Sequence, residues 1–73
     1  MNSFNVGDLV VLTGEGCNQP APELMAIWRV ERLTDTYAAV KFDPDVQIAH
    51  MEGLERKRYP LDWLILYKRG HSD

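Results

Sequence analysis

The sequence predicts an all-β fold, a five-stranded SH3-like barrel with one short 3-10 turn before the last strand. Two observations predict it. Short runs of β-branched, aliphatic and aromatic residues alternate with glycine, proline and aspartate breakers along the chain. In addition, a sheet this small has to cover its own edges, which favours closure into a barrel. We expect a single domain over residues 1–69 and a flexible C-terminal tail over 70–73.

The first strand is expected at residues 8–13, directly after the turn signal Gly7-Asp8. Residues 14–23 follow as a long connection. They contain two glycines, two prolines and an asparagine, so we predict an irregular loop without regular structure.

The second strand, expected at residues 24–33, has an interrupted pattern. Met25 and Ile27 are two residues apart, as expected for one face of a strand. Trp28 and Val30 are also two residues apart, but the face changes between the first pair and the second. A β-bulge explains such a shift, because it adds one residue to one strand of a pair. We therefore predict a bent strand with Met25, Ile27 and Val30 on the inner face and Trp28 facing outward or over the rim.

The remaining strands are expected at 36–43, 53–59 and 64–67, with a helical turn at 60–63 that begins at a proline. The strand at 53–59 is polar and is expected near an edge. Alternation then predicts the buried core, which consists of Val10, Leu12, Met25, Ile27, Val30, Ala38, Val40, Phe42, Tyr59, Leu64 and Leu66.

Three segments follow a family pattern: Phe4-x-Val6-Gly7-Asp8-x-Val10-x-Leu12, Met25-x-Ile27-x-x-Val30 and Arg58-Tyr59-Pro60-Leu61-Asp62-x-Leu64. Together they resemble the small bacterial YodC-like proteins. That resemblance implies an SH3-like barrel and no particular activity. The chain departs from the pattern in its first loop, which is longer and contains Pro20 and Pro22, and in its extended second loop at 44–53.

In outline the chain is also similar to the plasmid-borne type II dihydrofolate reductases, which are SH3-like barrels with a Gly-Asp opening and a Tyr-Pro step. In that family the active site is a pore in a tetramer, built around a Val-Gln-Ile-Tyr run directly before the proline. Here Arg56-Lys57-Arg58-Tyr59 precedes Pro60, and Val46-Gln47-Ile48 occurs in a loop. Only the tyrosine matches, so we do not expect an enzyme.

Charge is distributed unevenly along the chain. The net charge is −3, which argues against general nucleic-acid binding, and all eight basic residues lie from Arg29 onward. The densest positive feature is Arg56-Lys57-Arg58. These side chains either contact phosphates, as KOW-type barrels do with RNA, or form cross-strand ion pairs with acidic residues.

The aromatic residues suggest a partner surface. We expect Trp28, Tyr37 and Trp63 to lie partly exposed, because alternation places Tyr37 outward and Trp63 lies on the helical turn. The alternative is that the two tryptophans cover the open ends of a small barrel. The predicted partner-binding residues are therefore Trp28, Tyr37, Trp63, Arg56, Lys57 and Arg58.

No metal or cofactor is expected. Cys17 has no basic neighbour in sequence, and the spacing of His50 and His71 fits no common metal site. Asp43, Asp45 and Glu52 offer oxygen ligands in one loop, but the regular ligand pattern is incomplete. One cysteine, no signal-peptide pattern and no apolar run of membrane-spanning length make the cytoplasm the expected location.

Three function hypotheses follow. The leading one is a non-catalytic protein-interaction module that binds an unknown protein partner or a second copy of itself. The second is a nucleic-acid-associated accessory protein that contacts phosphates through Arg56-Lys57-Arg58. The third is a tetrameric enzyme like the type II dihydrofolate reductases.

Overall fold

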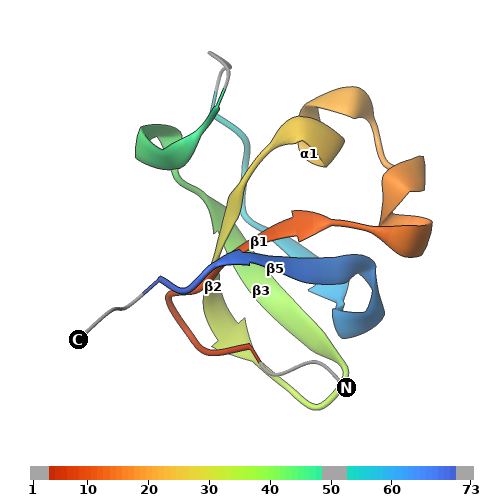
Figure 1. Cartoon of the computed structure of the whole chain (residues 1–73). Coiled ribbons are helices and arrows are strands. Elements are labelled where there is room, and N and C mark those ends of the chain that lie inside the picture. The colour runs from red at the N-terminus through yellow and green to blue at the C-terminus, as the bar shows by residue number, and fades with distance from the viewer. Residues whose placement is uncertain (1–3, 49–52, 71–73) are drawn as a thin grey trace.

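The structure is a computed structural model, and it describes residues 4–48 and 53–70. Five antiparallel strands form one sheet in the order β4-β3-β2-β1-β5 (Figure 1). Their bounds are β1 Leu9–Leu12, β2 Trp28–Leu33, β3 Tyr37–Phe42, β4 Lys57–Pro60 and β5 Leu64–Lys68. The predicted all-β fold with five strands is confirmed.

The 3-10 turn η3 (Leu61–Trp63) joins β4 to β5, as predicted. These two strands are the ends of the sheet, and within residues 4–48 and 53–70 no strand pairing joins them. The sheet is therefore open, and closure into an SH3-like barrel stays a prediction.

The connection between β1 and β2 is ordered, so the prediction of an irregular loop at 14–23 is wrong. It contains the 3-10 turn η1 (Gly14–Asn18) and the short helix α1 (Ala21–Met25). The two prolines that suggested a loop lie at the N-cap and in the first turn of α1, where the fixed φ of proline suits a helix. Gly16 lies against η3, where a Cβ atom would come within 3.0 Å of the Trp63 carbonyl oxygen.

Helix α1 also reverses the predicted faces of Met25 and Trp28. Met25, predicted to be buried, is 65% exposed at the end of the helix, and Trp28, predicted to face outward, is 0% exposed. Because the strand begins only after the helix, the inward alternation runs through Ala26, Trp28 and Val30. The predicted bulge exists, but it lies between Val30 and Arg32 rather than before Val30.

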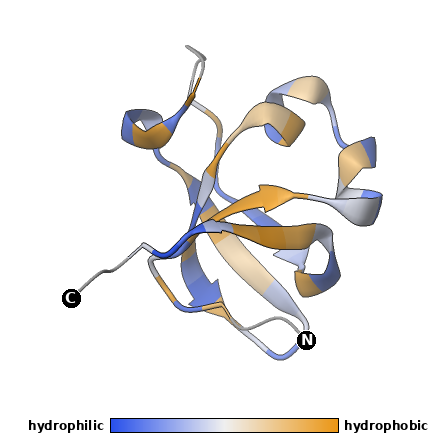
Figure 2. Cartoon of the chain, in the orientation of Figure 1, coloured by the Kyte–Doolittle hydropathy of each residue, from blue (hydrophilic) through white to orange (hydrophobic). Residues whose placement is uncertain are grey.

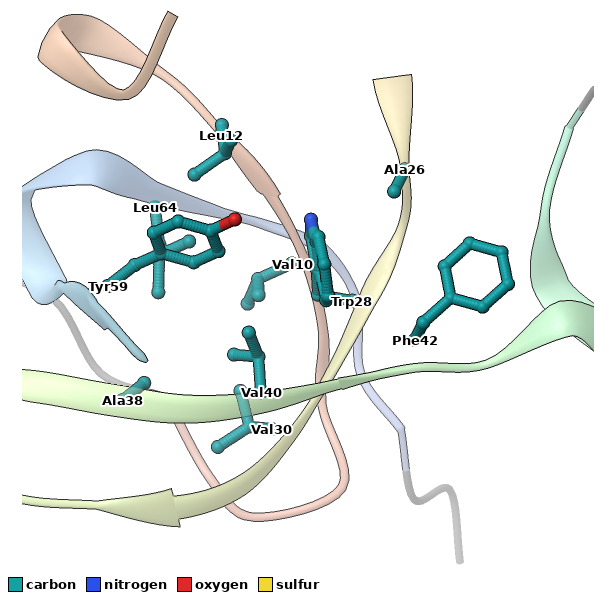
Figure 3. Close-up of a cluster of buried hydrophobic side chains, with 10 residues drawn as sticks. All are labelled: Val10, Leu12, Ala26, Trp28, Val30, Ala38, Val40, Phe42, Tyr59 and Leu64. Carbon is teal, nitrogen blue, oxygen red and sulfur yellow. The ribbon is translucent and has the colours of Figure 1, made fainter. Parts of the chain in front are cut away.

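The core is centred on Trp28, whose ring lies between those of Phe42 and Tyr59 (Figure 3). Both ring pairs are edge-to-face, with centroids 6.3 and 5.7 Å apart. The indole Nε1 donates to the Glu23 carbonyl oxygen of α1 at 3.2 Å, which satisfies the one polar group of that ring. Burial is confirmed for most of the predicted core: Val10, Leu12, Ile27, Val30, Ala38, Val40, Phe42, Tyr59 and Leu64.

Two details of the core differ from the prediction. Leu66 is half-buried, and the prediction omitted Leu9, Ala26 and Trp28, which are buried. Ile27 is buried outside the main cluster, where its backbone N–H donates to Gln47 Oε1 at 2.8 Å. The Gln47 side-chain amide donates in turn to the Ile27 carbonyl at 2.9 Å, so one side chain satisfies both backbone groups of Ile27.

A buried carboxylate joins the segment before β1 to the segment after β5. Asp8 is 2% exposed and accepts hydrogen bonds from the Asn5 N–H at 2.8 Å, Arg69 Nη1 at 2.8 Å and the Gly70 N–H at 3.2 Å. Gly70 approaches the backbone of Gly7 so closely that a Cβ atom would clash with its carbonyl oxygen. Burial alone raises the pKa of Asp8, but the hydrogen bonds and the Arg69 charge together hold it below its usual value.

Candidate anion-binding groove

A groove of about 610 Å³ lies on the face of β2, β3 and β4 opposite the core. We call it the basic groove, and its lining is Glu31, Arg32, Tyr37, Ala39, Arg56, Lys57 and Arg58. Figure 2 shows the contrast along the chain: β1 is largely hydrophobic, whereas β4 begins in a hydrophilic stretch. Tyr37, Arg56, Lys57 and Arg58 were predicted site residues, and the structure brings them together here.

The bulge in β2 supplies two further side chains to the groove. Val30 is buried and Leu33 packs against the core, so both point inward although they are three residues apart. The extra residue between them places Glu31 and Arg32 together on the outer face, since a bulge opposes two residues to one on the partner strand. A regular strand would have turned one of the two inward.

Arg32 and Arg58 face each other across a single small residue. Arg32 is the strand partner of Ala39, and Ala39 is in turn the partner of Arg58. The three residues therefore form one row across β2, β3 and β4. Because alanine has a short side chain, the row is low in the middle and high at both ends.

One cation of the groove is neutralised within the chain. Arg56 Nε donates to Glu31 Oε1 at 2.8 Å, so the predicted cross-strand ion pair exists for Arg56. In the part of the chain that the structure describes, no carboxylate pairs with Arg32, Lys57 or Arg58. The guanidinium carbon of Arg58 lies 6.0 Å from the centroid of the Tyr37 ring, within cation–π range.

The groove is a local concentration of positive charge. Its described lining has four cationic side chains and one carboxylate, a formal charge of +3, whereas the whole chain carries −3. The remainder of the chain therefore carries −6. A surface with unpaired cations close together attracts anions and raises their local concentration.

The two tryptophans lie outside the groove. Trp28 is fully buried, and therefore the expectation that it is partly exposed is wrong. Trp63 is half-buried on η3 and packs against the core, with its ring 6.2 Å from that of Tyr59. The Tyr59 hydroxyl donates to the Glu23 carboxylate, and burial first, then this contact, raises the pKa of Tyr59 above its usual value. These aromatics hold α1 and η3 on the core.

Sequence reasoning missed Glu31, Arg32 and Ala39. The usable signal was the spacing of Val30 and Leu33, because two inward residues three apart in one strand require a bulge between them. Because the bulge was predicted before Val30, Glu31 and Arg32 were not expected on the same face.

Among the residues that the structure describes, the other candidates do not assemble a second site. Cys17 is exposed, while His50, Glu52 and His71 lie outside the described residues. The Asp43 carboxylate accepts from the Asp45 N–H and from Arg29, and these bonds, in that order, lower the pKa of Asp43. Residues 4–48 and 53–70 contain no group of three His, Cys, Asp or Glu placed to hold a metal ion.

Across the same described segments, no helix has the length and apolar character needed to cross a membrane. Comparison with protein-family models, with curated proteins and with solved structures found no match. The resemblances to YodC-like proteins and to type II dihydrofolate reductases therefore stay predictions, as does the cytoplasmic location.

Proposed function

We propose that this chain is a small non-catalytic binding module and that its basic groove takes an acidic segment of a partner protein. The observation that carries the proposal is the pair of arginines on the outer face, Arg32 and Arg58, with Lys57 at the margin of the groove, all without a carboxylate partner in the described residues. Like charges held close together repel each other, and an anionic ligand removes that repulsion.

An acidic protein segment fits the charge distribution better than a nucleic acid does. A phosphate backbone extends beyond the groove and would meet the remainder of the chain, which carries −6. A short segment ends within the groove and avoids that repulsion. Arg56, one of the three residues in the nucleic-acid hypothesis, is already paired with Glu31.

The interface is expected to be weak and sensitive to salt. The groove is lined mainly by charged side chains, and Tyr37, itself half-buried, is the one aromatic residue among the described lining residues. Charged contacts at such a surface mainly set the association rate and the choice of partner. Added salt should therefore weaken binding, because exposed charges are screened.

The test is fluorescence anisotropy with a short labelled peptide of glutamate and glycine, compared with a peptide of serine and glycine. We expect only the glutamate peptide to bind, and Arg58→Gln to weaken binding while Lys68→Gln, which removes one charge outside the groove, leaves it unchanged. Equal weakening by both variants would show a general charge effect and contradict the proposal.

A second measurement separates the alternatives. Single-stranded DNA or RNA that binds more tightly than the acidic peptide supports the nucleic-acid hypothesis instead. Light scattering identifies a second copy of the chain as the partner if the wild-type protein is a dimer and Arg58→Gln is a monomer.

A further inference from the structure

The row of Arg32, Ala39 and Arg58 has the geometry of a seat for one compact anion. Each arginine is one strand away from Ala39, so their Cα atoms lie about 10 Å apart, twice the usual strand spacing. Both side chains are long and exposed, and the half-buried alanine between them leaves the centre of the row open. Two guanidinium groups can therefore converge on a single group above Ala39.

We propose that this seat binds a phosphomonoester carried on a side chain of the bound acidic segment. The inference rests on the function proposed above and names the chemical group that the groove recognises best. A phosphorylated side chain offers three acceptor oxygens and a charge of about −1.5 to −2 at neutral pH. A carboxylate has two oxygens and one negative charge, so a phosphomonoester offers the two arginines one more acceptor oxygen and up to one more charge.

The surrounding side chains favour this occupant. Glu31 is the one carboxylate among the described lining residues, and its ion pair with Arg56 reduces its repulsion of an incoming anion. Lys57, at the start of β4, is the strand partner of the buried Val40, so it adds positive charge at the margin of the groove rather than beside Ala39. Tyr37 supports the Arg58 guanidinium from below, so Arg58 is partly ordered before a ligand arrives.

The experiment uses three labelled peptides that differ at one position, which is phosphoserine, glutamate or serine in an otherwise identical acidic sequence. We expect the phosphoserine peptide to bind about tenfold more tightly than the glutamate peptide, as one or two added charge-assisted hydrogen bonds allow. Arg32→Gln and Arg58→Gln should each remove most of this preference, and Lys68→Gln should preserve it.

Ala39→Leu tests the geometry without changing any charge. A leucine fills the low centre of the row, so the preference for phosphoserine should fall while the glutamate peptide still binds. Thermal unfolding of each variant checks that it folds; if Ala39→Leu does not fold, Ala39→Val takes its place as the smaller filling.

The outcomes separate the two proposals. Phosphoserine and glutamate peptides that bind equally overturn the phosphate seat and leave the acidic-segment proposal intact. Failure of both peptides to bind overturns both. A further competition test uses inorganic phosphate or single-stranded DNA at the same concentration as the phosphoserine peptide. If either displaces the peptide, the proposal is wrong, because the groove would then bind phosphate without recognising the protein segment that carries it.

Discussion

Arg69 and Arg58 are both exposed arginines near an end of the sheet, and they differ in what their charges contact. The Arg69 guanidinium donates to the buried carboxylate of Asp8, which also accepts two backbone N–H groups. Arg58 lies over Tyr37, and no carboxylate in the described chain pairs with it. The first cluster is satisfied internally and holds chain segments together, whereas the second leaves charge available to a ligand.

The contrast between Arg69 and Arg58 predicts that one cluster contributes to stability and the other to binding. Changes in the Asp8 cluster should alter the free energy of unfolding and leave peptide binding unchanged in the folded protein. Changes in the basic groove should do the opposite. Four predictions test this division, in order of decreasing expected effect.

Asp8→Ala should lower the free energy of unfolding by about 3 kcal/mol, because it leaves Arg69 and two backbone N–H groups without their acceptor. Urea unfolding measures this loss. Glu55→Ala removes an exposed carboxylate and is the matched control, with an expected change below about 0.5 kcal/mol. Equal effects in the two variants would show that the buried cluster does not stabilise the fold.

Gly70→Ala should destabilise the protein by about 1–2 kcal/mol, because a Cβ atom at this position clashes with the carbonyl of Gly7 and displaces the Gly70 N–H from Asp8. The loss is smaller than that of Asp8→Ala because Asp8 keeps its hydrogen bonds from Asn5 and Arg69. Gly53→Ala is the control, since its Cβ atom would lie 3.9 Å from Phe42 in ordinary contact. A wild-type unfolding midpoint for Gly70→Ala contradicts the close approach.

Acid should destabilise the protein through Asp8 and Asp43, whose pKa values lie below the ordinary 3.8 in the folded state. A carboxyl group with a lowered pKa binds fewer protons when folded than when unfolded. Its contribution is therefore complete above about pH 5 and is lost as the pH falls through the folded pKa. Urea midpoints measured from neutral to acid pH should fall, and the slope should be shallower in Asp8→Asn.

Arg58→Gln should change the free energy of unfolding by less than about 0.5 kcal/mol, because it removes an exposed cation that has no ion pair in the described residues. The variant loses the contact between Arg58 and Tyr37, but it also loses the repulsion between Arg58 and the cations Arg32 and Lys57, so the two effects on the free energy of unfolding offset each other. A loss above about 1 kcal/mol would assign Arg58 a structural role and remove the contrast with Arg69.

Period-two alternation predicted the strands well where nothing interrupts it. In β3, Ala38, Val40 and Phe42 point inward as expected, and Tyr37 is consequently on the outer face. Pro60 correctly marked the turn before β5.

Alternation failed where a short helix changes the phase of the chain. Residues 24–33 were predicted as one strand, but residues up to Met25 belong to α1, and no local signal separates the last turn of the helix from the start of the strand. The faces of Met25 and Trp28 were exchanged as a result. Four of the seven described lining residues of the basic groove were predicted, namely Tyr37 and Arg56-Lys57-Arg58. The contribution of Arg32 depends on strand register, which is a tertiary property.

Gln47 has a consequence for local opening of the molecule. Its side-chain amide bonds both backbone groups of Ile27, just before β2, and also donates to the Asp43 carbonyl, just after β3. One side chain therefore fastens the end of β3 to the start of β2. Gln47→Ala should speed the hydrogen exchange of the Ile27 amide, because that N–H loses its acceptor.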